Sequence, residues 1–328
     1  MRQADDRLQA FDLVRLLAVA YVISLRHIPN YLTQDRTGPL NTMVTYLMLG
    51  CLVFVSGYVL TRRYPALGDG KSTWAFLTRR LLRVYPLYVV ALLGYVVYDR
   101  SLTAANVIAH LLSLSLVLTP ATGEPLRTIW FVSIIILYYF AYVGFARMKD
   151  AFLVIVAVLA TLVLLVVNTC TGYTDERLAL FLPLFAAGIV MARRQVLPRL
   201  RAAPVLISAV VFLSCGIAQL VNVRPPALPE ALLVVVWMLS GVLPVWAAAS
   251  WLIRKLGWGK WAGRLCYTSF CAYLFHRHVY RILLLIFQPS SDGGTVLYLA
   301  LVGVPLAFLV GFCIQSAYDR LTSRLSLR

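Results

Sequence analysis

The sequence has few charged residues, and acidic residues are the scarcest of them. Charged residues make up 13% of the 328 residues, hydrophobic residues make up 61%, and the mean hydropathy is +0.82. A soluble domain typically has about 25% charged and about 45–50% apolar residues. The composition therefore excludes a soluble enzyme, a disordered chain and a secreted disulfide scaffold, and it indicates a protein that lies in the lipid bilayer.

Cysteine pairs at metal-binding spacing and the residue pattern of a signal peptide are also lacking. We interpret the six cysteines as small buried hydrophobic residues, and we expect no metal site. The N-terminal sequence MRQADDRLQA lacks the pattern of a signal peptide. Since the first apolar run contains Asp12 and Arg15, we expect it to be a retained first span.

Basic residues outnumber acidic residues by 30 to 13, which gives a formal charge of +17. Such an excess is typical either of nucleic-acid binding or of the positive-inside rule of membrane proteins. Lys and Arg are concentrated in alternate connections, whereas residues 168–177, 221–230 and 288–295 hold only Arg177 and Arg224. We therefore expect the basic connections to be cytoplasmic, and we expect no nucleic acid as a partner.

Apolar runs follow one another at 11–28, 40–60, 84–98, 104–118, 129–145, 151–167, 178–192, 204–220, 231–253, 265–287 and 296–316. Between them, 61–83 is the longest polar connection. The alternation of charge requires one run near the middle not to cross the membrane. Run 104–118 is short and contains His110, so we predict a re-entrant or interfacial helix there. The expected fold class is all-α: one polytopic membrane domain over 1–328 with ten transmembrane helices and cytoplasmic termini.

Charged side chains inside apolar runs are candidate functional residues, because they are rare in spans and usually face the bundle interior. Asp12 and Arg15 lie three residues apart on one helix face, either as an interfacial pair or as a functional pair. Arg26 and His27 lie near the far end of the same run. At about 100° per residue, a straight helix aligns Arg26 with Arg15 and turns His27 away by about 120°.

Three arginines precede the third apolar run, where Arg79, Arg80 and Arg83 lie at helical spacings. Guanidinium groups in one place repel one another unless an anion is present, and arginine is a preferred ligand of phosphate. One interpretation is a topogenic cluster that faces lipid phosphates. The other is a pocket for a phosphorylated cytoplasmic ligand.

Further polar and aromatic residues stand out in other runs. Ser56, which precedes a glycine, permits either close helix packing or access of a ligand to the backbone. Trp130 opens its run either as part of an aromatic belt or as a binding residue. Ser269, Tyr273 and His276 form one helical stripe, which we expect to face an interior cavity.

Together these motifs resemble the integral membrane acyltransferase 3 family. The matching blocks occur in family order: Asp-x-x-Arg at 12–15, FVSGY at 54–58, RLLRVYPLY at 80–88, Trp-Phe at 130–131 and SFCAYLFH at 269–276. The family usually has ten residues between the arginine and a histidine of the first helix. Here Arg26 holds that position and His27 follows it. Either an extra residue in the helix, such as a π-bulge, restores the register, or the usual catalytic histidine is absent.

The resemblance implies transfer of an acyl group from cytoplasmic acyl-CoA, in the first place acetyl-CoA, to a glycan hydroxyl in the bacterial inner membrane. The acceptor would be an exopolysaccharide, a lipopolysaccharide or a lipid-linked sugar. His27 is the first candidate for the general base and His276 the second, and Arg15 would hold the donor or stabilise the oxyanion. Expected donor ligands are Arg79, Arg80, Arg83, Tyr85 and Tyr88, and expected substrate ligands are Asp12, Arg26, Ser56, Trp130, Ser269 and Tyr273.

Transport is the alternative to acyl transfer. Buried arginines and a displaced histidine also fit a protein that exports a polysaccharide or a lipid-linked glycan without chemistry. The lipid bilayer is an expected partner in both cases, and assembly as a homodimer stays open.

Overall fold

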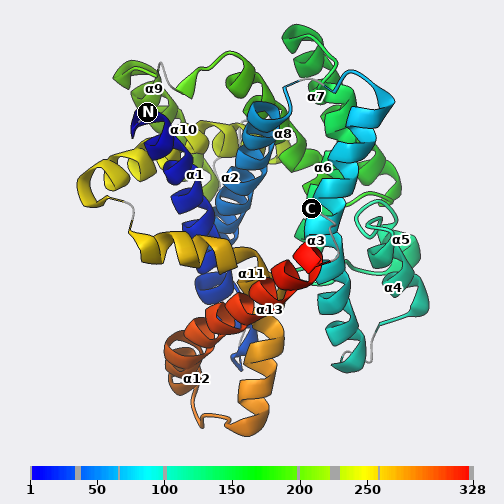
Figure 1. Ribbon diagram of the computed structural model, residues 1–328, viewed down its shortest axis with the longest axis vertical. Helices are drawn as coiled ribbons and strands as arrows, with labels where there is room; N and C mark the ends of the chain where they lie inside the picture. Colours follow the sequence, from blue (N-terminus) through cyan, green and yellow to red (C-terminus); the bar gives the residue numbers. More distant parts are fainter. Residues whose placement is uncertain are drawn as a thin grey trace. The chain divides into compact units, whose positions relative to one another are not determined.

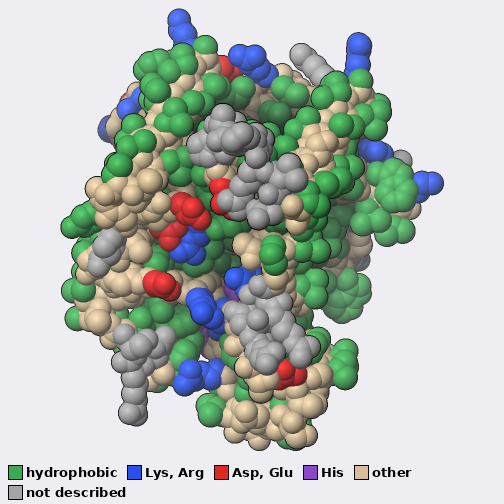
Figure 2. Space-filling model, turned by 180° about the vertical axis from the view of Figure 1, so that it is seen from behind, with side chains coloured by type: hydrophobic (Ala, Val, Ile, Leu, Met, Phe, Trp, Pro, Cys, Tyr) green, Lys and Arg blue, Asp and Glu red, His purple; other side chains and the backbone are tan. Residues whose placement is uncertain are grey.

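The computed structural model describes residues 2–33, 38–65, 67–98, 102–197, 200–221, 230–257 and 259–324. All regular secondary structure in these ranges is helical, which confirms the all-α expectation (Figure 1). The chain divides into two compact units, one formed by Met1–Leu52 and Pro244–Arg328 and the other by Val53–Leu243. Hydrophobic side chains cover much of the face in Figure 2, as the composition predicts for a membrane protein.

The first unit combines the two ends of the chain. Its N-terminal elements are α1 (Arg2–Tyr21), the π-helix η1 (Val22–Arg26), the 3₁₀ turn η2 (Ile28–Tyr31) and the first part of α2 (Pro39–Arg63). Its C-terminal elements are the end of α10 (Glu230–Leu256), α11 (Lys260–Ile286), α12 (Asp292–Tyr298), the π-helix η4 (Leu299–Gly303) and α13 (Val304–Arg324). Both α1 and α13 pack against α11 (Figure 1).

A glycine allows α11 and α13 to approach closely. A Cβ atom on Gly311 would lie only 2.7 Å from the amide nitrogen of Ala272. Next to this contact, the Cys271 thiol donates to Gln315 Oε1 at 3.2 Å, and Gln315 Nε2 donates to Asp319 Oδ1 at 3.1 Å. The polar groups of the two helices therefore satisfy one another, as is common in membrane bundles.

The second unit contains the elements between these two parts. They are the end of α2, α3 (Gly70–Tyr98), α4 (Ala104–Leu111), α5 (Thr119–Thr122), α6 (Trp130–Phe145), α7 (Asp150–Thr171), α8 (Glu176–Arg193), α9 (Ala202–Leu220) and the start of α10. In this unit α2 and α8 meet through glycines. A Cβ atom on Gly57 would lie 2.3 Å from the Phe185 carbonyl oxygen, and one on Gly188 would lie 2.3 Å from the Phe54 carbonyl oxygen. This contact confirms the packing interpretation of the glycine that follows Ser56.

Six helical segments among the described residues are long and apolar enough to cross a membrane: Pro39–Arg63, Gly70–Tyr98, Asp150–Thr171, Ala202–Leu220, Glu230–Leu256 and Asp292–Arg324. Each of the other predicted spans also forms a helix. Of these, α6 has 16 residues, fewer than the roughly 20 of a typical span. The helices α1, α8 and α11 carry more charged or polar side chains, so the count of ten spans stays a prediction.

Most of the polar connection over 61–83 is helical. Helix α2 continues to Arg63 and α3 begins at Gly70, so the three clustered arginines lie inside α3. Lysine and arginine are good helix formers, so a basic segment does not interrupt a helix. Asp69 caps α3 by accepting a hydrogen bond from the Ser72 amide at 2.9 Å, and hydrogen bonds from Ser72 lower the pKa of the Asp69 carboxyl.

Run 104–118 does not form a spanning helix, as predicted. Helix α4 has eight residues and is about 12 Å long, far short of a bilayer. His110 is buried at its end, where Nδ1 donates to the Asn106 carbonyl at 2.9 Å and Nε2 accepts from the Leu126 amide at 3.0 Å. The Tyr88 hydroxyl on α3 donates to the His110 carbonyl at 2.8 Å. Internal hydrogen bonds therefore hold this segment in the second unit.

The contact between α2 and α8 predicts that Gly188→Ala destabilises the protein. Its Cβ atom would collide with backbone, which cannot rotate away, so we expect a loss of about 1–3 kcal/mol in the free energy of unfolding. Thermal unfolding in detergent measures this loss. Gly144→Ala is the matched control, because its Cβ atom would meet only the end of Met148 at 4.0 Å. Equal melting temperatures for the two variants would contradict the prediction.

The buried His110 predicts a pH-dependent stability. Burial lowers the pKa of His110 below the usual 6.5, so the unfolded chain binds a proton at a higher pH than the folded chain. The stability that the neutral imidazole provides is present above about pH 6.5 and is lost as the pH falls through the lower folded-state pKa. We expect the difference in Tm between wild type and His110→Gln to be largest near pH 7.5 and to shrink toward about pH 5. A difference that stays constant would contradict this assignment.

Candidate active site

The end of the first helix carries an extra residue. Over Val22–Arg26 the backbone is a π-helix, and the His27 amide donates to the Val22 carbonyl, five residues back, at 3.0 Å. One added residue rotates the side chains that follow it by about 100° relative to an α-helix. The extra residue therefore restores the register. This is the first of the two alternatives for the histidine spacing, a π-bulge in the first helix. His27 takes the direction that Arg26 would have in a straight helix.

His27 meets His276 of α11 inside the first unit. Nδ1 of His27 lies 2.7 Å from Nε2 of His276, the ring centroids are 4.9 Å apart, and the ring planes differ by 2°. The two ring centroids are farther apart than the two nitrogens by about twice the distance from the centre of an imidazole ring to its nitrogen. The two imidazoles therefore meet edge to edge in one plane. Both side chains are buried.

Hydrogen bonds determine which nitrogens of this pair carry protons. Nδ1 of His276 lies 2.7 Å from the Tyr273 carbonyl oxygen, which can only accept, so this nitrogen carries a proton. In the neutral imidazole, Nε2 of His276 must then accept a hydrogen bond from Nδ1–H of His27. Nε2 of His27 keeps its lone pair and is the basic atom of the pair.

Each histidine of the pair has an arginine as a neighbour in the sequence. Arg277 follows His276 directly, is buried, and donates from Nη2 to Asn30 Oδ1 at 2.7 Å. Arg26 ends the π-helix and is partly buried. Burial raises the pKa of Tyr31 in η2, and the positive charge of Arg277 opposes that rise. Positive charge beside a neutral base favours negative charge on a reacting group.

A second contact joins α1 and α11 closer to the N-terminus. Arg15 Nη1 donates to Asp12 Oδ1 at 3.0 Å and lies 3.9 Å from Cys266 Sγ. Arg15 precedes His27 by twelve residues, which corresponds to about 18 Å along a helix. Asp12 also holds the guanidinium on the side away from His27. The two expected roles of Arg15, in donor binding and in stabilising the oxyanion, stay predictions.

The polar stripe on α11 lies between these two contacts. Ser269, Tyr273 and His276 are all buried, which confirms that the stripe faces the protein interior. The Ser269 hydroxyl donates to the Cys266 carbonyl at 2.7 Å. The Tyr273 ring lies 6.2 Å from the His276 ring, between centroids. Substrate binding by Ser269 and Tyr273 stays a prediction.

The arginine cluster divides between two environments in the second unit. Arg79 and Arg83 are exposed, whereas Arg80 is 9% exposed and its Cζ lies 5.1 Å from the centroid of the Tyr64 ring. Within the part of the chain that the structure describes, Nε and Nη2 of Arg80 have no hydrogen-bond partner. A buried guanidinium with two unused donor nitrogens favours a bound anion.

The tyrosines of the same motif are used in internal hydrogen bonds. The Tyr85 hydroxyl donates to the Leu111 carbonyl at 2.7 Å. The Tyr88 hydroxyl donates to the His110 carbonyl at 2.8 Å and lies 3.1 Å from Ser133 Oγ. These hydroxyls anchor the α4 segment, and the expected donor contact of both tyrosines stays a prediction.

Trp130 packs among charged and aromatic side chains. The Arg177 guanidinium carbon lies 4.3 Å from the centroid of its ring, and Phe181 stacks at 6.3 Å between centroids. Arg177 is in turn paired with Asp175, through Nε and Oδ1 at 2.7 Å. Ser56 is partly buried near the contact of α2 with α8. These contacts account for packing and leave the expected substrate roles of Trp130 and Ser56 as predictions.

Sequence analysis missed Tyr280, which lies one helical turn beyond His276. Its ring packs edge-on against the His276 ring, with centroids 5.5 Å apart and an interplanar angle of 77°. Its hydroxyl donates to the Ile23 carbonyl of η1 at 2.9 Å. Tyr280 continues the stripe of Ser269, Tyr273 and His276, so extending that pattern by one turn would have identified it.

Comparison with known protein families gives one match that covers most of the chain. A family model described as an acyltransferase domain matches residues 8–315, which include the histidine pair, Arg15 and the arginine cluster. No curated protein and no solved structure matches the chain. Within the described ranges, no group of three or more His, Cys, Asp or Glu residues is arranged to hold a metal ion. Since the family model covers far more than half of the sequence, the chain belongs to the acyltransferase 3 family.

Proposed function

We propose that the protein transfers an acyl group from cytoplasmic acyl-CoA to a hydroxyl of a glycan, within the bacterial inner membrane. Family membership supports acyl transfer, and the apolar helices support a membrane location. The observation that carries the proposal is the buried His27–His276 pair, whose basic atom is Nε2 of His27. The proposed acceptor is an exopolysaccharide, a lipopolysaccharide or a lipid-linked sugar. In the proposed topology both termini lie in the cytoplasm.

The proposed reaction begins when Nε2 of His27 takes the proton of the acceptor hydroxyl. The acceptor oxygen forms a bond to the thioester carbonyl carbon, and the carbonyl electrons move to oxygen. The tetrahedral oxyanion then collapses and its C–S bond breaks. Coenzyme A leaves as the thiol with the proton from His27, so the base returns to its initial state.

His276 acts on the reaction through His27. It accepts the hydrogen bond from Nδ1 of His27, which fixes the tautomer and stabilises the imidazolium that forms during proton transfer. The aspartate of a serine-protease triad has the same position relative to its histidine. Because a neutral imidazole replaces the carboxylate here, the electrostatic help is weaker, and the Tyr273 carbonyl supplies the orientation.

Arginines provide the proposed contacts to the donor. Arg80 is the phosphate ligand we favour in the second unit, because it is buried and has unused donor nitrogens. Arg15 lies about 18 Å along α1 from His27. Such a spacing suits a donor whose phosphates are far from its thioester, as in coenzyme A. Arg277, which follows His276 in the sequence and is buried, is the cation that we propose to favour the oxyanion.

Removal of either histidine is expected to abolish most of the acyl transfer. We expect His27→Ala and His276→Ala to lower kcat by about 100-fold or more, because a positioned general base contributes at least this much. The measurement is incorporation of label from [14C]acetyl-CoA into the glycan fraction of membranes from cells that carry the protein. His278→Ala is the matched control on the same helix, since it lies outside the hydrogen-bonded pair.

Two results of this measurement would contradict the proposal. Unchanged label incorporation by both histidine variants would exclude the pair as the base. Glycan export by the wild-type protein with no incorporation of label would favour the transport alternative.

Arg80 is expected to determine the affinity for the donor. We expect Arg80→Ala to weaken binding of coenzyme A by at least about tenfold, because a buried charge-assisted hydrogen bond is lost. Arg79→Ala and Arg83→Ala should have smaller effects, because both side chains are exposed. Titration calorimetry with coenzyme A measures these affinities, and the exposed Arg62→Ala serves as a control. An unchanged affinity of the Arg80 variant would remove this residue from the donor site.

A further inference from the structure

The Ile23 carbonyl decides which register the end of the first helix adopts. In an α-helix the amide of His27 would donate to this carbonyl, four residues back. Here that amide donates to the Val22 carbonyl at 3.0 Å, and the Tyr280 hydroxyl donates to the Ile23 carbonyl at 2.9 Å. The hydroxyl therefore supplies a donor to a carbonyl that the π-helical register leaves without its usual amide. While Tyr280 occupies it, the π-helical register is favoured.

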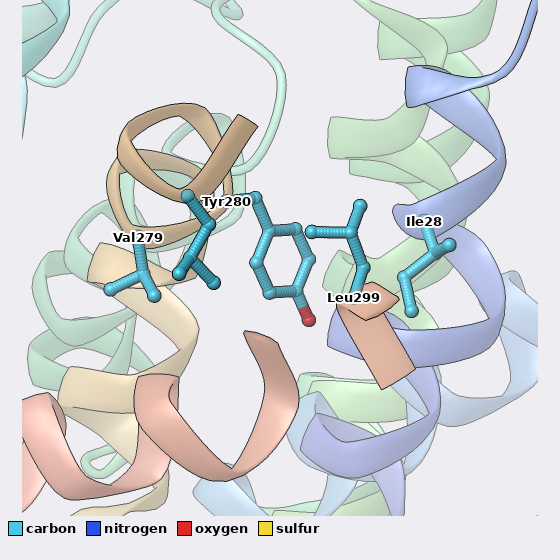
Figure 3. Close-up of a cluster of buried hydrophobic side chains, with 5 residues drawn as sticks. Ile28, Val279, Tyr280 and Leu299 are labelled. Carbon is cyan, nitrogen blue, oxygen red and sulfur yellow. The ribbon is translucent and has the colours of Figure 1, made fainter. Parts of the chain in front are cut away.

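Packing fixes Tyr280 in the position that this hydrogen bond requires. Tyr280 is fully buried and belongs to a cluster formed with Ile28, Val279, Leu283 and Leu299. Figure 3 shows its ring beside Leu299, with Ile28 farther along. Since Ile28 follows His27 directly, the same cluster packs both the tyrosine and the end of the π-helix.

Gly303 makes room for the tyrosine ring. A Cβ atom at this position would lie 2.9 Å from Tyr280 Cε1 and 3.1 Å from its Cδ1. Gly303 ends the second π-helix, η4, and Leu299 of the cluster begins it. Both π-helices of the first unit therefore contact this one side chain.

We propose that Tyr280 is a positioning residue, whose hydroxyl holds the Ile23 carbonyl and thereby keeps His27 against His276. This proposal rests on the proposed function only for its effect on catalysis. Without the hydroxyl, the His27 amide can take the Ile23 carbonyl and return the turn to an α-helix. His27 would then rotate by about 100° and leave the pair.

Tyr280→Phe in two backgrounds tests the proposal. Phenylalanine keeps the ring in the cluster and removes only the hydroxyl. The second background lacks Leu25, a 62% exposed residue of the π-helix. After this deletion the bond from His27 to Val22 spans four residues, so an ordinary α-helix keeps His27 in place. Tyr280 is then no longer needed for the register.

We expect Tyr280→Phe to lower kcat by at least about tenfold in the wild-type background, with an unchanged KM for acetyl-CoA. In the background without Leu25, the same substitution should leave kcat unchanged. Tyr298→Phe is the matched control, since its hydroxyl makes a longer contact, 3.4 Å, to the Leu283 carbonyl. An equal loss in both backgrounds, or no loss in either, would overturn the proposal.

A second readout does not depend on catalysis. In protein labelled with 15N-histidine, a coupling across the N–H···N bond reports the contact of His27 with His276. We expect Tyr280→Phe to abolish this coupling in the wild-type background and to preserve it when Leu25 is absent. This pattern without any acyl transfer would support the positioning role and contradict the proposed function. A coupling that survives Tyr280→Phe in the wild-type background would overturn the positioning role.

Gly303→Ala provides a further variant if the deletion prevents folding. Its Cβ atom presses on the Tyr280 ring, so we expect the same loss of kcat and of the 15N coupling as in Tyr280→Phe. Retention of the coupling in this variant, together with normal activity, would count against the proposal.

Discussion

The backbone at the end of the first helix must satisfy its hydrogen bonds within a bundle of apolar helices, where water is scarce. One extra residue leaves the Ile23 carbonyl without its usual amide, and Tyr280 of α11 provides the donor. The same helix provides the imidazole that meets His27. The two contacts between α1 and α11 depend on each other, because the backbone contact orients the side chain that makes the other. The candidate site is thus a consequence of hydrogen-bond satisfaction within the first unit.

Around the short helix α4 of the second unit, several polar side chains meet the same physical requirement. His110, Tyr85 and Tyr88 all direct their polar atoms to backbone groups around the short helix α4. Arg80 is different, because it is buried with donor nitrogens that the described residues leave unused. A buried cation with unused donor nitrogens is costlier than an unpaired hydroxyl, and it therefore favours a bound anion.

Hydropathy and charge predict the positions of the helices in this chain well, but they predict poorly which side chains and backbone groups contact one another. The apolar runs fall on helices because the length and the continuity of an apolar segment are local properties. The position of His27 depends on a π-helix, and that helix is stabilised by the hydrogen bond from Tyr280 to the Ile23 carbonyl, which residue spacing does not encode. The burial of Arg80 is similarly decided by packing on the Tyr64 ring rather than by the cluster itself. Sequence alone likewise does not reveal the carbonyl groups that accept the hydroxyls of Tyr85 and Tyr88.

The π-helix at Val22–Arg26 has a consequence for how such a chain can change over time. An insertion in a helix normally turns every later side chain toward a new neighbour. Here the Tyr280 hydroxyl on α11 donates to the Ile23 carbonyl, which the insertion leaves without its usual amide. The effect of the insertion on hydrogen bonding is therefore confined to one turn. A lineage would therefore acquire the tyrosine before or together with the added residue. Histidine spacing alone is then a poor criterion for deciding whether a relative has lost its base.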